Sequence, residues 1–157
     1  MNKLSHLDGK GNPAMVNISE KKITSRMAVA QSVVELGEEI IAQLQDGDIH
    51  TNKGPVFHTA IIAGTMGAKK TADLVPFCHP LGLDDCKIQI TTEGTRAIIT
   101  CTAKVKAKTG IEMEAITGAS IAAITIYDMC KAMSHDIEIT KTRLLEKTGG
   151  KNDFKRN

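Results

Sequence analysis

The chain has 157 residues, and its 20 Lys or Arg nearly balance its 18 Asp or Glu, for a formal net charge of +2. This balance offers no broad basic surface to a polyanion, and 3% aromatic content without Trp offers few rings for stacking bases, so we expect no nucleic-acid partner. The length suits one domain, and 41% hydrophobic residues suit a soluble globular protein with an aliphatic core.

Cysteine usage and the N-terminus indicate the compartment. Cys78, Cys86, Cys101 and Cys130 show no C-x-x-C spacing, and the chain does not open with a basic segment followed by an apolar one. These features predict free thiols in the cytoplasm. The longest uncharged apolar run, Ala115 to Tyr127, is too short for a membrane span of about 20 residues, so no membrane partner is expected.

The first half of the chain begins with a polar, turn-rich segment. We expect residues 1–14 to form a mobile arm ahead of a single domain over residues 15–148. Loose alternation of apolar and polar residues predicts a strand from Ile23 to Val34. Helical spacing then predicts a helix from Leu36 to Leu44, and a loop is expected over residues 48–55.

The second half contains the clearest patterns. Apolar residues recur at helical spacing from Phe57 to Val75, and two alternating runs around a central Glu-Gly predict a β-hairpin within residues 86–110. The stretch from Gly110 to Lys131 reads as a long helix of small and aliphatic residues. A last strand is predicted over residues 137–147, followed by a flexible tail over residues 149–157.

The order of these elements predicts the fold class. Apart from one additional helix, it is strand, helix, strand, strand, helix, strand, the split βαβ order of ferredoxin-like α+β domains. Such an antiparallel sheet carries helices on one face, so its other face meets solvent or another subunit. The long helix is apolar nearly all round, and Gly118 and Ala122 would let another backbone approach closely. We therefore expect an oligomer.

Four charged residues stand out on this apolar helix, because ionised side chains are costly to bury unpaired. Glu114 and Asp128 lie within about 40° of one face but roughly 21 Å apart along the axis, too far to act on one small molecule. Glu112 and Glu114 could simply favour the helix dipole, with Asp128 and Lys131 forming a surface pair. Alternatively, a neighbouring subunit places its own helix end beside the first, which is the arrangement we prefer.

The segment DLVPFCHPLG presents Cys78 and His79 between two prolines that restrict the backbone. His79 is either a proton donor or orienting group, or a loop histidine without function, and a Cys–His nucleophilic pair is less favoured because adjacent side chains in a rigid turn diverge. No second Cys/His pair stands at ligand spacing, so we predict no metal site.

GTMGAKKT, from Gly64 to Thr71, nearly matches the phosphate-binding loop G-x-x-x-x-G-K-[ST]. Lys69 replaces the second Gly of that motif, and the helical pattern continues on both sides, which argues against such a loop. Lys69 and Lys70 could still meet phosphate as plain cations, or pair with Asp73.

Several segments together resemble the molybdenum cofactor biosynthesis protein C family: KGPVFHTAIIAG, AKKTADLVPFCHPL, KTGIEMEAITGAS, IYDMCKAM and KTGGK. The resemblance runs from about Met15 to Phe154, with the motifs in family order and at family spacing. It implies a ferredoxin-like α+β fold and a homohexamer built as a trimer of dimers, with active sites at the dimer interface. It also implies a lyase that converts 3′,8-cyclo-7,8-dihydro-GTP into cyclic pyranopterin monophosphate and releases diphosphate.

The resemblance also implies the roles of individual residues. Asp128 matches the family's active-site acid, and Lys131 and Lys53 match lysines regarded as catalytic. We expect Lys53 and Lys131 to lower each other's pKa by repulsion, making one an effective base. The expected substrate-binding residues are Phe77, Cys78, His79, Glu112, Met113, Glu114, Arg26 and Lys147, with Lys69 and Lys70 added for the phosphates. No cofactor is expected to be required, although Mg²⁺ could accompany the diphosphate.

Two departures from the family pattern occur near these residues. Phe77 stands where Leu is more common, which we expect to alter packing rather than chemistry. The loop Asn52-Lys53-Gly54-Pro55 has Gly-Pro in place of a more usual Gly-Asp, which could shift how Lys53 is aimed. From the residues alone, two other functions are open: a nucleotide hydrolase that uses the Gly64–Thr71 loop, and a non-enzymatic oligomeric interaction module.

Overall fold

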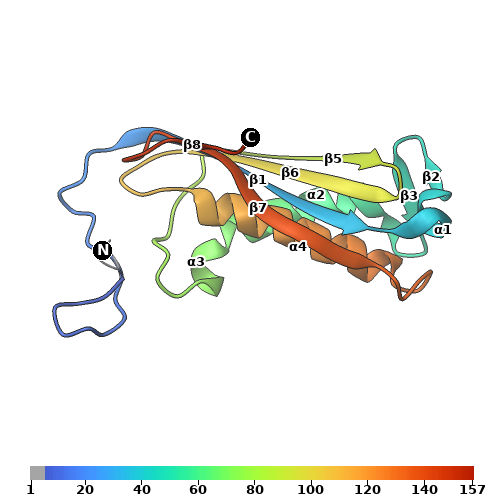
Figure 1. Ribbon diagram of the computed structural model, residues 1–157, viewed down its shortest axis with the longest axis horizontal. Coiled ribbons are helices and arrows are strands. Elements are labelled where there is room, and N and C mark those ends of the chain that lie inside the picture. Colours follow the sequence, from blue (N-terminus) through green and yellow to red (C-terminus); the bar gives the residue numbers. More distant parts are fainter. Residues whose placement is uncertain (1–5) are drawn as a thin grey trace.

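The computed structural model describes residues 6–157 and is built around a five-stranded antiparallel sheet with two long helices against one face (Figure 1). The strands lie in the order β5-β6-β1-β7-β8, and every neighbouring pair is antiparallel. Their bounds are β1 Thr24–Glu35, β5 Asp85–Glu93, β6 Arg96–Ala107, β7 Glu138–Thr148 and β8 Phe154–Lys155. The long helices are α2 Val56–Lys69 and α4 Glu112–Cys130.

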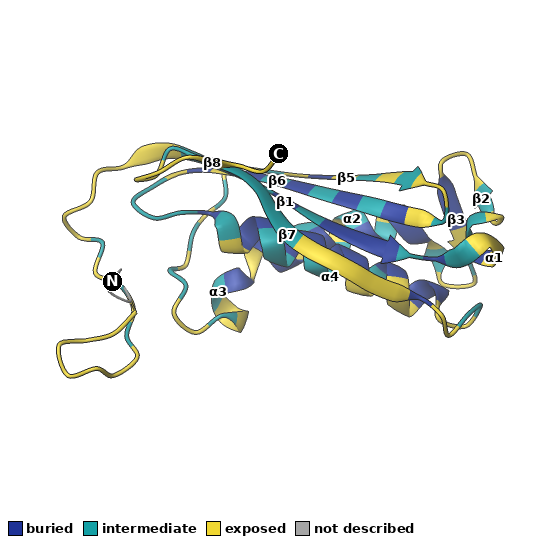
Figure 2. Cartoon of the chain, in the orientation of Figure 1, coloured by how far each residue is buried: buried dark blue, intermediate teal, exposed yellow. Residues whose placement is uncertain are grey.

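The core lies between the sheet and these two helices. On β6, buried Ala97, Ile99, Cys101, Ala103 and Val105 alternate with more exposed residues, as expected for a strand with one covered face (Figure 2). Helix α4 packs on β1, β6 and β7, and α2 packs on β5 and on α4. Small buried side chains of the central strands, including Ala28, Ala30 and Ala103, let α4 lie close to the sheet.

Helices α2 and α4 cross at a contact between glycines. A Cβ atom on Gly64 would lie 2.6 Å from the carbonyl oxygen of Gly118 and 3.0 Å from the Cβ atom of Ala122. The close backbone approach expected at Gly118 and Ala122 is therefore made by α2 of the same chain. These two residues are buried in the protomer and do not argue for a subunit contact.

Most of the expected elements are confirmed, including the first strand, the hairpin, the long helix and the last strand. The expected helix over 57–75 is interrupted at Lys70, after which α3, Thr71–Leu74, begins. The helix expected from Leu36 to Leu44 is shorter, because α1 spans only Gly37–Ile41.

The loop expected over residues 48–55 is wrong, since this region forms a small antiparallel sheet of β2 Leu44–Gln45, β3 Asp48–Thr51 and β4 Gly54–Pro55. Asp46 and Gly47 reverse the chain with φ angles of 51° and 82°, which lets β2 pair with β3.

The segments expected to be a mobile arm and a flexible tail each contain a short pairing. Leu7 and Pro13 form an isolated bridge, and β8 pairs with Glu146 and Lys147 of β7. Residues 1–5 of the expected arm lie outside the described residues. Along residues 6–157, no helix is both long and apolar enough to cross a membrane.

Candidate active site

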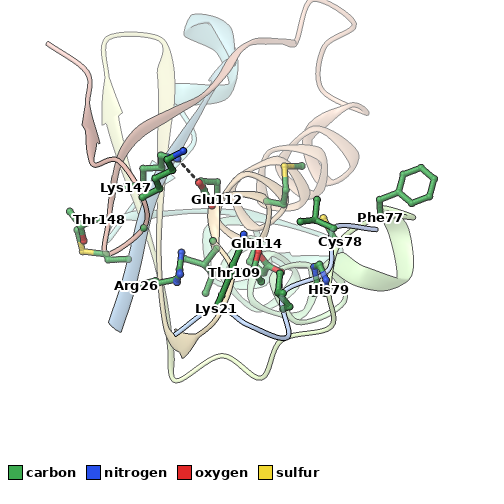
Figure 3. Close-up of a pocket in the computed structure, with 18 of the residues that line it drawn as sticks. Lys21, Arg26, Phe77, Cys78, His79, Thr109, Glu112, Glu114, Lys147 and Thr148 are labelled. Carbon is green, nitrogen blue, oxygen red and sulfur yellow. Dashed lines mark hydrogen bonds and ion pairs between the residues drawn. The ribbon is translucent and has the colours of Figure 1, made fainter. Parts of the chain in front are cut away.

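A pocket of about 530 Å³ opens at the N-terminal end of α4, where β1, the end of β7 and the turn after α3 converge (Figure 3). Eight of the ten expected substrate-binding residues line it: Arg26, Phe77, Cys78, His79, Glu112, Met113, Glu114 and Lys147. These residues come from four separate segments of the chain. The fold therefore gathers most of the expected binding set into one cavity.

One wall of the pocket is charged. The Nζ atom of Lys147, at the end of β7, donates a hydrogen bond of 2.9 Å to Oε1 of Glu112 in the first turn of α4. Arg26 on β1 donates from Nε to the carbonyl oxygen of Ala107 at 3.1 Å, which fixes the guanidinium at the cavity (Figure 3). Burial opposes ionisation of Glu112, but the hydrogen bond and charge of Lys147, with the charge of Arg26, bring its pKa below the ordinary 4.5. Glu112 is therefore a carboxylate at neutral pH.

Glu114 differs from Glu112 although it is only two residues away. It is 4% exposed, and burial, followed by repulsion from Glu112, raises its pKa above 4.5. Two acids in one pocket are thus pushed in opposite directions, a pattern typical of sites that hold and transfer protons. Glu114 is the acid best suited to carry a proton.

The turn after α3 brings Cys78 and His79 to the opposite side of the pocket. The backbone N–H of Cys78 donates to the carbonyl of Val75 at 3.1 Å, which closes the turn. Burial, and then the charge of Glu114, raise the pKa of the Cys78 thiol above its ordinary 9.0, so the nucleophilic thiolate is disfavoured. The ring of Phe77 points away from the other pocket residues (Figure 3).

The three expected catalytic residues form a second cluster at the far end of α4. Nζ of Lys131 donates to Oδ1 of Asp128 at 2.7 Å, and Nζ of Lys53 donates to Oδ2 at 3.0 Å and to the Asp128 carbonyl at 3.2 Å. Lys53 therefore reaches from the β3–β4 turn to α4, although it is 75 residues away in the chain. The cluster is solvent-exposed in the protomer.

The expectation that Lys53 and Lys131 lower each other's pKa is wrong for Lys131. Asp128 lies between the two ammonium groups, and its hydrogen bond and charge raise the pKa of Lys131. In return, the hydrogen bonds from Lys131 and then Lys53 lower the pKa of Asp128. The attraction to the shared carboxylate outweighs the repulsion between the lysines.

Within one protomer the pocket and the cluster do not meet. None of the three cluster residues lines the pocket, and the fourteen residues from Glu114 to Asp128 correspond to roughly 21 Å of helix. Lys69 and Lys70 are exposed at the end of α2 and do not line the pocket either, so their contact with phosphate stays a prediction.

The Gly64–Thr71 segment is not a phosphate-binding loop. It forms the last turns of α2 and the start of α3, and Gly64 and Gly67 are buried against α4 and β5. The backbone N–H groups of a helix interior are used within the helix and cannot cradle phosphate. The interpretation of this segment as a helix is confirmed.

Two further cations of the pocket were not singled out from the sequence. Lys21, ahead of β1, and Lys151, after the Gly149-Gly150 turn, both line the cavity. Lys151 follows the pair Gly149-Gly150, only four residues after Lys147. Two lysines on either side of a glycine turn are a weak sequence signal for phosphate binding. Lys21 lies in a polar segment whose position depends on contacts such as that of Lys108 Nζ with the Ser19 carbonyl, at 2.8 Å, which no local pattern predicts.

Comparison with known proteins places these residues in a wider context. The model of the MoaC family matches residues 15–150. The chain is 49% identical over 153 residues to the cyclic pyranopterin monophosphate synthase of Xanthomonas campestris pv. campestris, covering 97% of this chain and 93% of the relative. It is 49% identical over 154 residues to the molybdenum cofactor biosynthesis bifunctional protein of Synechocystis sp., covering 95% of this chain and 44% of the relative. It is 46% identical over 168 residues to molybdenum cofactor biosynthesis protein 1 of Dictyostelium discoideum, covering 96% of this chain and 27% of the relative.

Proposed function

The chain belongs to the MoaC family, and from this membership we propose that it acts as a cyclic pyranopterin monophosphate synthase, a lyase of molybdenum cofactor biosynthesis. The observation that carries this conclusion is 49% identity to such a synthase over nearly the full length of both chains. The similarity includes the segments that build the pocket and the Asp128 cluster. The alternatives of a nucleotide hydrolase and an interaction module lose their support, since the phosphate loop is absent from the described chain and the family is enzymatic.

The proposed substrate is 3′,8-cyclo-7,8-dihydro-GTP, with diphosphate as the second product. The volume of about 530 Å³ is in the range of small-molecule sites. A triphosphate carries several negative charges, and Lys147, Arg26, Lys21 and Lys151 supply cations around the cavity. No cofactor is required in this proposal, although Mg²⁺ could accompany the diphosphate. The enzyme would work in the cytoplasm.

The two acids of the pocket take different roles in the proposed mechanism. Opening the purine-derived ring and rebuilding it as a pterin requires protons to be given and taken, and Glu114, with its raised pKa, is placed for both. Glu112 stays ionised and holds Lys147 in place. His79, beside Glu114 on the pocket wall, orients the base or the sugar (Figure 3).

The Asp128 cluster supplies positive charge from a neighbouring protomer. The raised pKa of Lys131 keeps its ammonium group protonated, which suits a cation that stabilises the departing phosphate groups rather than a base. Asp128 positions both lysines through its two carboxylate oxygens. Neither group can reach the pocket of its own chain, so the complete site requires two protomers.

This requirement agrees with the proposed assembly, a ferredoxin-like protomer in a homohexamer arranged as a trimer of dimers. The strand order β5-β6-β1-β7 supports the ferredoxin-like assignment. Large apolar side chains remain exposed on the two helices, where a neighbouring protomer could cover them. They are Ile62 and Met66 on α2, and Met113, Ile124 and Tyr127 on α4.

The test is incubation of the purified protein with the cyclised GTP intermediate, following the pterin product and diphosphate by mass spectrometry. We expect both products in equal amounts, and Lys131→Ala should lower kcat by about a hundred-fold or more. Lys87→Ala, on an exposed position of β5, is the matched control and should leave turnover unchanged. Release of inorganic phosphate from GTP without a pterin product would contradict the proposal and favour a hydrolase.

A further inference from the structure

Helix α2 begins without a capping side chain of its own. Pro55 occupies the N-cap position with φ −70° and ψ 126°, and makes no side-chain cap hydrogen bond. The first N–H groups of a helix have no partner within it, so an acceptor must come from elsewhere. Here it comes from Asp48, at the start of β3. Its Oδ1 accepts from Phe57 N at 2.7 Å, and its Oδ2 accepts from His58 N at 3.1 Å.

Asp48 is fully engaged in this arrangement. Oδ1 also accepts from its neighbour Ile49 N at 2.7 Å, and Oδ2 lies 2.7 Å from Nδ1 of His58. Only 3% of the residue is exposed. Burial opposes ionisation, but the hydrogen bonds from Phe57 and His58 bring the pKa of Asp48 below 3.8, so a buried carboxylate sits at the positive end of α2.

The same carboxylate closes the base of the turn that carries Lys53. Strands β3 and β4 pair through His50 with Pro55 and Thr51 with Gly54. Within the turn, Lys53 N donates to Oγ1 of Thr51 at 3.2 Å, and Gly54 has a φ of 110° that favours glycine. Asp48 is the first residue of this β3–β4 hairpin, and α2 begins directly after its last residue, Pro55. The hydrogen bonds of Asp48 to α2 therefore hold the two ends of the hairpin together.

We infer that Asp48 is a positioning residue, which caps α2 from across the β3–β4 hairpin and thereby holds Lys53 within hydrogen-bond distance of Asp128. The proline ring at position 55 carries no hydrogen-bond acceptor, so the neighbouring strand supplies the cap through Asp48. The side chain of Lys53 reaches from this hairpin to Asp128 on α4. If the hairpin lost its hydrogen bonds to α2, it would move and carry the ammonium group of Lys53 away from Asp128. The expected effect of Asp48 on turnover rests on the proposed function, whereas its effect on the Lys53–Asp128 contact does not.

The test compares Asp48→Asn and Asp48→Ala with wild-type protein. Asn keeps the shape of Asp48, but its amide nitrogen cannot accept the His58 hydrogen bonds. The first readout is the acetylation rate of Lys53, measured by peptide mass spectrometry relative to exposed Lys87. We expect this ratio to rise about three- to ten-fold, towards its value in Asp128→Asn, because exposed hydrogen bonds such as those from Lys53 Nζ to Asp128 protect the amine only to about this extent. The second readout is kinetic: kcat should fall at least about ten-fold, with KM within about two-fold, because the pocket is untouched.

Two further variants separate positioning from general destabilisation. Ile99→Val, in the core of β6, lowers stability without touching the hairpin and should leave the Lys53 acetylation ratio unchanged. Adding Pro55→Asp to Asp48→Ala places a carboxylate at the N-cap itself, within reach of the same N–H groups of Phe57 and His58, and should restore both kcat and Lys53 protection.

The outcomes distinguish this inference from the proposed function. A folded Asp48→Asn protein with an unchanged Lys53 ratio would overturn the inference, as would failure of Pro55→Asp to restore it in a folded double variant. If wild-type protein showed no synthase activity while Asp48→Asn still raised the Lys53 ratio, the proposed function would fail and the positioning role would stand.

Discussion

Glu114 is a buried acid whose ionisation works against the folded state. Its pKa in the folded protein is above 4.5, so as the pH rises past that value the unfolded chain loses the proton first. The free energy of unfolding should therefore decrease from pH 4.5 up to the raised folded pKa and then level off. In Glu114→Gln this decrease should be absent, and the variant should be at least as stable as wild type at pH 7. Urea unfolding at pH 4 to 8 measures the effect.

The matched control for that series is Glu38→Gln, at an exposed position of α1, whose stability profile should follow wild type. The same Glu114→Gln protein should lose at least about ten-fold in kcat, because Gln cannot transfer a proton. A stability profile identical to wild type would show that Glu114 is not desolvated, and Glu114 could then no longer be assigned as the acid that carries the proton.

Cys78 should behave as an inert thiol. Its raised pKa leaves little thiolate at pH 7, so alkylation by iodoacetamide should be slower than that of a small free thiol, measured by mass spectrometry of the modified peptide. Cys78→Ala should keep kcat within about three-fold, with any larger change in KM, because the side chain lines the pocket without attacking the substrate. A hundred-fold loss of kcat would instead identify a nucleophile.

At the residue scale, contacts between residues close together in the chain could be predicted from the sequence, and contacts between distant residues could not. The motifs of Phe77–His79 and Glu112–Glu114 are local, and the structure brings them into one pocket. The carboxylate of Asp128 between Lys53 and Lys131 is not local, because Lys53 arrives from 75 residues away. The sequence places Asp128 one helical turn from Lys131, but it does not show that Lys53 binds the other oxygen of the same carboxylate, so repulsion between the lysines is all that it predicts.

At the element scale, strong periodicity was predictable and turn geometry was not. The β5–β6 hairpin alternates strictly, and α4 continues for 19 residues without a proline. The β2–β3 pairing depends on the left-handed conformation of Asp46. The apolar residues before Asp46 are spaced as in a helix, so the sequence pattern does not indicate that a strand pairing begins there. The cap of α2 was hidden for a similar reason, because Asp48 reaches the helix through a hairpin rather than from the N-cap position.

The crossing of α2 and α4 makes a prediction at this scale. A Cβ on Gly64 would press against the carbonyl oxygen of Gly118, and a backbone atom can move away only if the helices separate. Gly64→Ala should therefore lower the free energy of unfolding by about 3 kcal/mol in urea titrations. Gly82→Ala, where the added Cβ meets no atom within 4 Å, is the control and should change it by less than about 0.5 kcal/mol. Equal stability of the two variants would mean that the helices are not in backbone contact.

At the scale of the whole molecule, α4 acts as a rod with a different chemical group at each end. The pocket takes its acids from the first turn, and the Asp128 cluster uses the last. Both ends belong to the expected site, and one rigid helix cannot bring them together. In a two-fold symmetric pair of protomers, however, each pocket can receive the cluster of the other, and two equivalent sites result.

This arrangement predicts that two inactive variants restore each other. Glu114→Gln damages the pocket, and Lys131→Ala damages the cluster, so each protein alone should be nearly inactive. After co-refolding at equal amounts, a site combines an intact pocket with an intact cluster by chance in about a quarter of cases, and activity should recover to about a quarter of wild type. Mixing Glu114→Gln with Glu112→Gln is the control, because every site then keeps a damaged pocket and should stay inactive. Native mass spectrometry reports whether mixed assemblies form, and mixed assemblies without recovered activity would place the complete site within a single protomer.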